Sequence, residues 1–229
     1  MKKIISLILA ILCIVAVFCS CSKNKSEENT TTAAVENSDE NAVYTSGDYS
    51  YVKLADGTVK TVKYNKTEST GEVIVPDIID GLKVTVIGEN TFTDAQKLTS
   101  VRLPRYLTKV ESYAFNKSPV AKVLFTQVTD NTELTVESHA FSECDNIRQV
   151  DFSKAVKRVE ASAFYLGKIP RRILFTIDPE YIDINAFDTG KNFDNLMLCH
   201  RGDISNYKNL KAFADAYGIE PVLSTVNAE

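Results

Sequence analysis

Residues 98–115 read LTSVRLPRYLTKVESYAF, and this stretch contains the pattern that decides the fold. In its first part, Val101 and Leu103 lie on either side of a polar residue, as in a strand that buries one face. In its second part, Val110 stands five residues before Phe115, which follows an alanine. A segment this short cannot bury its own apolar side, so the pattern predicts a stable fold only if neighbouring copies stack.

The same spacing returns along the chain. The aromatic residue recurs at intervals of 23, 26, 23 and 23 residues, at Phe92, Phe115, Phe141, Phe164 and Phe187. A branched aliphatic residue lies five positions before each of them, at Ile87, Val110, Val136, Val159 and Ile182. Self-similarity of this kind is typical of repeat architectures. The sequence therefore predicts a solenoid of short turns whose aromatic rings form one column.

A strand-like segment follows each aromatic residue. We expect strands over residues 98–103, 120–125, 147–152 and 193–198, with a further one after Pro170. Residues 73–76 match residues 101–104 and place another strand one turn earlier. The longest interval contains a polar insertion, residues 129–132, at a point where a loop can lengthen without disturbing the stack.

Both ends of such a stack need a cover, because the terminal faces are apolar. Upstream, residues 51–64 predict a β-hairpin with its turn at Asp56-Gly57. Downstream, the pattern predicts a helix from Ser205, as N-cap, to Gly218, just past the end. The apolar face of this helix consists of Leu210, Phe213, Ala214 and Tyr217.

An L-x-x-L-x-L strand followed by LTKVESYAF resembles the BspA-like leucine-rich repeat of bacterial surface proteins. The segment GLKVTVIGENTF, residues 81–92, is similar to the same repeat, and the resemblance covers roughly residues 50–222. It implies a β-rich α/β solenoid: a right-handed coil with a parallel strand ladder, a hairpin cap and a helix cap. It also implies a surface-displayed adhesion or interaction protein, since some members bind host matrix proteins.

The first 21 residues predict a lipoprotein signal peptide. Lys2 and Lys3 precede an apolar run over residues 4–18, which is shorter than the roughly 20 residues of a membrane-spanning helix. Residues 18–21, Phe-Cys-Ser-Cys, resemble a bacterial lipobox in which Cys21 receives the lipid. Cys19 and Phe18 depart from the residues that are commonest at these lipobox positions. Ordinary secretion is the alternative. We expect an extracytoplasmic protein that reaches the membrane only through its lipid anchor.

Residues 22–47 predict a disordered tether, because they are rich in Asn, Thr, Ser and Glu and contain almost no large apolar side chains. The folded domain is then expected over residues 48–229, with the repeats over about 70–202.

Composition excludes several classes of function. The 229 residues carry 26 Lys and Arg against 30 Asp and Glu, a net charge of −4, so the broad basic field of a nucleic-acid-binding protein is absent. His139 and His200 lie in different phases of the repeat, and we expect two surface histidines without a metal. Cys144 and Cys199 are expected to be free thiols. No catalytic motif and no recurring pair of carboxylates is found, so we expect neither a cofactor nor enzymatic activity.

In a solenoid, the outward side chains of the stacked strands form the default binding face. The candidate residues are Arg102, Lys122, Leu124, Gln149, Asp151, Arg172, Leu174 and Met197. Leu124, Leu174 and Met197 are apolar where solvent is expected, which indicates either a contact patch for a partner or a surface that a neighbouring loop covers.

A second candidate is the tripeptide Arg201-Gly202-Asp203, an adhesion motif that also suits a turn before a helix. We expect a protein partner, on the host matrix or a microbial surface. A glycan-binding module and a structural envelope protein without a dedicated ligand are the alternatives.

Overall fold

The computed structural model describes residues 42–66, 71–126, 133–165, 170–187, 193 and 196–225. The predicted signal peptide with Cys21, most of the predicted tether and the polar insertion at residues 129–132 lie outside these residues. Within the described residues, no helix is long and apolar enough to cross a membrane.

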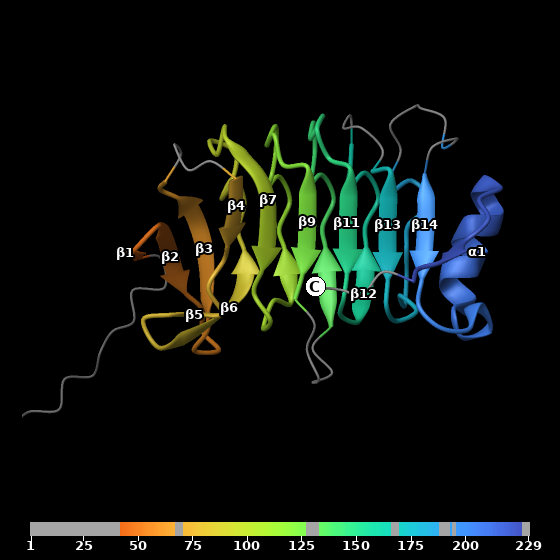
Figure 1. Cartoon of the computed structure of the whole chain (residues 1–229). Helices are drawn as coiled ribbons and strands as arrows, with labels where there is room; N and C mark the ends of the chain where they lie inside the picture. The colour runs from red at the N-terminus through yellow and green to blue at the C-terminus, as the bar shows by residue number, and fades with distance from the viewer. Residues whose placement is uncertain are drawn as a thin grey trace, which may run out of the picture. The chain divides into compact units, whose positions relative to one another are not determined.

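The described chain winds between two sheets built mainly of parallel strands (Figure 1). The seven-stranded sheet consists, in spatial order, of β15 (Val222–Leu223), β14 (Met197–His200), β13 (Arg172–Phe175), β11 (Gln149–Phe152), β9 (Lys122–Phe125), β7 (Leu98–Leu103) and β4 (Gly71–Ile74). The eight-stranded sheet consists of β1 (Val43–Ser46), β2 (Tyr49–Lys53), β3 (Val59–Tyr64), β6 (Leu82–Ile87), β8 (Lys109–Val110), β10 (Leu134–Val136) and β12 (Val156–Val159), with β5 (Ile78–Ile79) paired to β6. This alternation confirms the predicted solenoid.

The five recurring phenylalanines form the predicted column. Successive ring centroids are 4.7, 4.9, 5.0 and 4.7 Å apart from Phe92 to Phe187, and each pair of rings is stacked. All five side chains are fully buried or nearly so. The aliphatic residues five positions earlier are buried beside them, most of them on the short strands of the eight-stranded sheet.

Backbone hydrogen bonds connect successive turns at the bends that carry the rings. The amide of Phe115 donates to the carbonyl oxygen of Ala140 at 2.9 Å, and the amide of Phe141 donates to Ala163 at 2.8 Å. The four alanines that precede Phe115, Phe141, Phe164 and Phe187 are fully buried, and Thr91, which precedes Phe92, is buried at the same position. Two residues before the first four of the five rings, the backbone takes a positive φ without glycine, at Asn90, Tyr113, His139 and Ser162.

A second column runs inside the seven-stranded sheet. Phe125, Phe152 and Phe175 stack at 4.8 Å intervals, and His200 occupies the next position in the register. The predicted last strand, residues 193–198, is displaced: β14 is Met197–His200 and pairs Leu198 with Ile173. Because the displacement is two residues, the inward and outward faces of the strand are unchanged.

The N-terminal cap is the predicted hairpin with one more strand. β2 and β3 pair antiparallel around the Asp56-Gly57 turn, as expected. β1 then pairs with β2, although Val43–Ser46 falls inside the predicted tether. The boundary at residue 47 is therefore wrong, and the folded domain begins at least five residues earlier.

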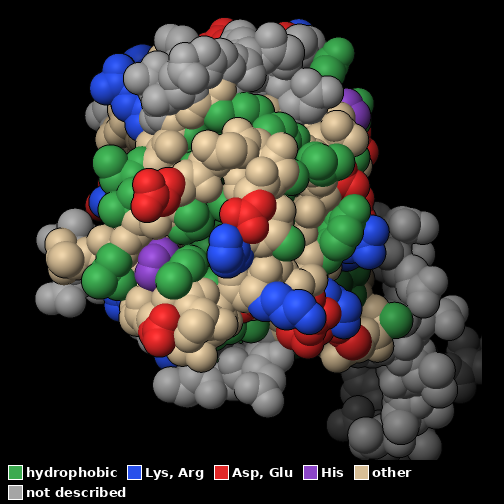
Figure 2. Space-filling model, turned by 90° about the vertical axis from the view of Figure 1, so that its right-hand side faces the viewer, with side chains coloured by type: hydrophobic (Ala, Val, Ile, Leu, Met, Phe, Trp, Pro, Cys, Tyr) green, Lys and Arg blue, Asp and Glu red, His purple; other side chains and the backbone are tan. Residues whose placement is uncertain are grey.

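The C-terminal cap contains α1 (Lys208–Tyr217), which buries Leu210, Phe213 and Ala214 and ends at Gly218 in the left-handed conformation. Ser205 is not its N-cap: it lies in a 3-10 turn, Ile204–Asn206, whose cap is Asp203. The first amides of α1 instead donate to Asp178, at 3.0 Å from both Asn209 and Leu210. Figure 2 looks onto this end, where basic and acidic side chains alternate among hydrophobic ones.

Candidate binding face

The outward residues of the seven-stranded sheet form two rows, because residues paired in a parallel register point to the same side. The first row consists of Ser100, Lys122, Gln149, Arg172 and Met197. The second row consists of Arg102, Leu124, Asp151, Leu174 and Cys199. All eight residues of the predicted face lie on these two rows, so the sequence assigned their direction correctly.

The second row is much less accessible than predicted. Leu124 is 9% exposed, Leu174 is 0% exposed, and Asp151 and Cys199 are also buried. The interpretation of Leu124 and Leu174 as an exposed apolar patch is therefore wrong. Met197, in the first row, is 50% exposed and is the one apolar member of that patch that solvent reaches.

A polar network covers part of the second row. Asp151 lies between the two buried leucines and accepts a hydrogen bond from Gln149 Nε2 at 2.8 Å. Arg172 places Nη1 3.6 Å from Asp151 Oδ2, and its Nη2 donates to Ser224 Oγ at 3.4 Å. The buried Oδ1 of Asp151 has no hydrogen-bond partner within the described chain, which is uncommon for a carboxylate.

Burial raises the pKa of the Cys199 thiol, against a smaller lowering by the nearby Arg172 guanidinium. Cys144 is buried on the other side of the coil, and burial raises its pKa to about 12. Both thiols are free, as predicted.

The first row remains accessible. Lys122, Gln149 and Arg172 are half-buried on three consecutive strands, and Arg102 is half-buried at the end nearer β4. Lys122 forms no ion pair with the described residues, whereas Arg102 lies 3.8 Å from Glu72. Apart from Met197, the accessible side chains named here are therefore polar, and three of the four are cationic.

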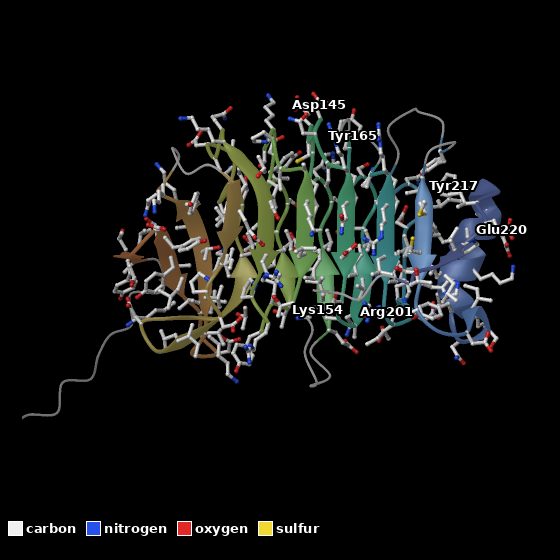
Figure 3. The ribbon with its side chains drawn as sticks, in the orientation of Figure 1. Asp145, Lys154, Tyr165, Arg201, Tyr217 and Glu220 are labelled. Atoms are coloured by element: carbon white, nitrogen blue, oxygen red, sulfur yellow. The ribbon has the colours of Figure 1, made fainter. Side chains whose placement is uncertain are left out.

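The Arg201-Gly202-Asp203 tripeptide follows β14 directly. Figure 3 places Arg201 at the same edge of the coil as Lys154, opposite the edge that carries Asp145 and Tyr165. Asp203 Oδ1 accepts a hydrogen bond from the amide of Ser205 at 2.9 Å, and this bond lowers the pKa of the carboxyl. The motif thus caps a turn, and its part in adhesion stays a prediction.

The two histidines are far apart in the fold, as predicted, but only one reaches solvent. His139 stacks on Tyr113 and meets the ring of Tyr165 edge-on, with ring centroids 5.2 Å away in both pairs. His200 is buried against Tyr207, so its prediction as a surface histidine is wrong. Among the residues that the structure describes, no three His, Cys, Asp or Glu side chains lie close enough to hold a metal ion.

Single glutamates, not pairs of carboxylates, recur at one position of the repeat. Glu137 accepts a hydrogen bond from the amide of Ser112 at 3.1 Å, and Glu160 accepts one from Ser138 at 3.4 Å. Glu111 does the same for the amide of Glu89 at 3.2 Å. Their position, one residue after each buried aliphatic, was visible in the sequence. These glutamates cap backbone amides between turns, which is a structural task.

Two facing ladders of short strands, each with its own column of stacked rings, define a leucine-rich-repeat solenoid. A family model described as the BspA type leucine-rich repeat region, in six copies, matches residues 58–194 and 128–216. The chain therefore belongs to the BspA-type leucine-rich repeat family.

The chain is also similar to solved structures of leucine-rich repeat proteins. A leucine-rich repeat protein of Treponema pallidum is 18% identical and covers 69% of this chain and 70% of its own, with a TM-score of 0.53. One from Bacteroides capillosus is 21% identical, covering 64% of this chain and 95% of its own, with a TM-score of 0.42. A leucine-rich cell surface protein of Faecalibacterium prausnitzii is 22% identical, covering 66% of this chain and 52% of its own, with a TM-score of 0.38. Comparison with curated proteins gave no match.

Proposed function

We propose that this protein binds other proteins through the first row of the seven-stranded sheet and acts by recognition, without chemistry. The observation that carries the proposal is the accessible series Lys122, Gln149 and Arg172, presented by three adjacent strands. Adjacent strands are about 4.8 Å apart, so the series forms a rigid, regularly spaced set of contacts. A rigid surface loses little conformational entropy on binding.

The charge of the face suggests the chemistry of its partner. Three basic residues, Arg102, Lys122 and Arg172, outnumber two acidic ones, Glu72 and Asp151, on this face. Arg172 pairs with Asp151, and Arg102 pairs with Glu72, so Lys122 is the basic residue without an ion pair among the described residues. A partner with an acidic, polar surface complements such a face and is steered towards it over a distance. Matrix proteins of a host and proteins of other microbial surfaces are the partners that the family resemblance suggests.

One observation favours a second candidate. The burial of Leu124 and Leu174 removes the apolar anchor that a high-affinity protein contact commonly uses. A structural envelope protein without a dedicated ligand has no need of such an anchor. The alternatives differ in a measurable way, because only the first requires the exposed first row.

We also propose that lipidated Cys21 holds the protein on the outside of a membrane. The support is the lipobox-like tetrapeptide behind an apolar run, and the polar residues that follow it as a spacer. Cys21→Ser should abolish incorporation of labelled palmitate in a bacterial host and release the protein from the membrane fraction. Labelling that persists in this variant would contradict the assignment.

The binding proposal is tested with the chain from Cys21 onward, immobilised and exposed to purified matrix proteins and, separately, to a glycan array. Lys122→Glu should weaken any protein contact by about tenfold, since it reverses a charge inside the row. Lys208→Glu, on the exposed side of α1, is the matched control and should bind like the wild type. Binding to glycans alone would favour the glycan alternative, and equal binding by both variants would exclude the first row.

A further inference from the structure

The two sheets do not end at the same level on the N-terminal side. The eight-stranded sheet continues from β6 through β3 and β2 to β1, whereas the seven-stranded sheet ends at β4 (Figure 1). Within the described residues, no strand of the second sheet lies opposite β3. The turn of the solenoid that contains β3 therefore has a strand in the eight-stranded sheet but, among the described residues, no strand opposite it in the seven-stranded sheet.

The edge of β4 at this level is unpaired within the described chain. Val75 donates its amide to Arg102 and Gly71 donates to Lys97, so the odd-numbered residues face β7. By the alternation of a parallel ladder, the amide and carbonyl groups of Glu72 and Ile74 point away from β7. Such an edge is a template for a further strand.

A groove of about 440 Å³ lies beside this edge. Ile74, Pro76 and Ile78 provide apolar walls, and the β1–β2 turn closes the other side. Ile74 is 64% exposed and Ile78 is 51% exposed, which is unusual for two large side chains in one place.

One lining residue, Tyr49, has a hydroxyl that is buried in the core and, among the described residues, unsatisfied. Tyr49 lines the groove and is 5% exposed, yet its buried Oη has no hydrogen-bond partner within the described chain. Burial raises the pKa of Tyr49 well above its usual range, with smaller contributions from Tyr64 and Asp48, so the group is a neutral donor and acceptor. A buried hydroxyl without a partner costs free energy.

The rim of the groove is acidic. Asp48 and Asp80 both line it, and Asp48 Oδ2 lies 3.8 Å from Nζ of the exposed Lys66. Asp80 accepts hydrogen bonds from Tyr51 at 2.6 Å and from Ser46 at 2.7 Å, and these bonds lower its pKa and keep it ionised. Two carboxylates beside an apolar wall complement a segment that carries both basic and apolar side chains.

We propose that this groove receives an extended segment of a protein partner, which pairs with the free edge of β4 and carries alternating apolar and basic side chains. The segment adds to the seven-stranded sheet a strand that lies opposite β3. Its apolar side chains contact Ile74 and Ile78, and its basic side chains lie near Asp48 and Asp80. The site lies apart from the first row, so it adds a second mode of recognition to the proposed function.

The test uses an acetylated, amidated octapeptide of alternating valine and lysine as the probe, with the isotope-labelled chain from Cys21 onward. The peptide should shift the amide resonances of residues 46–49 and 72–80. Ile74→Lys should weaken binding by about tenfold or more, because it places a charge on the edge and repels the lysines. Ile184→Lys is the matched control, since Ile184 is 51% exposed near the other end of the coil.

Two further measurements keep the result clear. A peptide with N-methyl groups on every residue keeps the charge but loses its amide donors, and it should not bind. Ile78→Lys replaces Ile74→Lys if the latter alters the thermal unfolding curve.

Three results would overturn the proposal. The first is no shift at millimolar peptide, and the second is equal binding of the plain and N-methylated peptides. The third is a concentration-dependent dimer that Ile74→Lys abolishes, which would make a second copy of this chain the occupant. Failure of the Lys122→Glu test leaves all three readouts unaffected, so the two proposals are judged separately.

Discussion

Lys154 places its ammonium group inside the coil, where only 1% of the residue is exposed. Nζ donates to the carbonyl oxygens of Arg105, at 3.2 Å, and of Leu107, two turns earlier in the chain. Arg105 holds the equivalent position in its own turn but pairs with Asp77 at the surface, at 2.7 Å. The residue at this position thus forms buried hydrogen bonds to an earlier turn in one case and a surface ion pair in the other.

Replacement of this lysine should be costly. Lys154→Met leaves two carbonyl groups without their charged donor and should lower the free energy of unfolding by about 1–3 kcal/mol. Arg105→Met removes an exposed pair and should cost less than about 1 kcal/mol. Urea denaturation of both variants measures the difference. An equal loss of unfolding free energy in the two variants would show that the buried hydrogen bonds of Lys154 stabilise the fold no more than the exposed ion pair of Arg105 does.

Tyr49 and Tyr51 lie two residues apart on β2 and should respond oppositely to loss of the hydroxyl. Tyr49→Phe removes an unsatisfied buried group and should raise the free energy of unfolding by about 1 kcal/mol. Tyr51→Phe removes the donor to Asp80 and should lower it by about the same amount. Thermal unfolding at neutral pH reports both signs, and a loss in both variants would show that Tyr49 has an unrecognised partner.

Cys144 donates its thiol to the carbonyl oxygen of Phe115 at 3.0 Å, inside the corner of the coil. With a pKa of about 12, almost none of it is thiolate at pH 8, and the thiolate is the reactive form. Iodoacetamide should therefore leave Cys144 unmodified in the folded protein and label it in urea, as read by peptide mass spectrometry. Rapid labelling without urea would contradict its burial.

At the scale of the element, α1 depends on a residue outside itself. Asp178 accepts hydrogen bonds from the first amides of the helix, and the negative charge also suits this end of the helix dipole. Asp178→Ala should lower the free energy of unfolding by about 1–2 kcal/mol and loosen the cap.

The control for this prediction is Asp215→Ala, which breaks an exposed pair with Lys211 in the same helix. That change should cost less than about 0.5 kcal/mol. Hydrogen exchange of the amides in α1 separates loosening of the cap from global unfolding. Faster exchange in the Asp215 variant than in the Asp178 variant would contradict the assignment of the cap.

The sequence predicted elements whose signals are local and missed those that depend on distant partners. The hairpin was predictable because Asp56-Gly57 marks its turn. β1 was not, because Val43–Ser46 adjoins a polar tract and becomes a strand only by pairing with β2. The start of α1 was displaced for the same reason, since its cap comes from a residue about thirty positions earlier.

At the scale of the whole molecule, the column of rings joins all the turns. Phe141→Ala, in the middle, removes contacts to both neighbours and should lower the free energy of unfolding by about 3–5 kcal/mol. Tyr165→Ala, at a 38% exposed position, should cost far less. Chemical denaturation measures the free energy of unfolding of both variants. Similar decreases in the two would contradict the prediction that the stacked ring contributes more to stability than the exposed one.

The direction of the binding face could be predicted from the sequence, but its accessibility could not. Strand alternation assigns Leu124, Asp151 and Leu174 to the outside. Whether an outward residue is covered depends on contacts such as that of Arg172 with Ser224, 52 residues later. The period of the repeat contains no information about such contacts.

The hydrogen bond that the first four ring-bearing residues donate to the alanine of the following turn has an evolutionary consequence. Because this joint is chemically the same between successive turns, a turn can be duplicated or deleted without any need to invent a new interface. The length of the coil can then change by whole units of about 23 residues, while the hairpin and the terminal helix stay as they are.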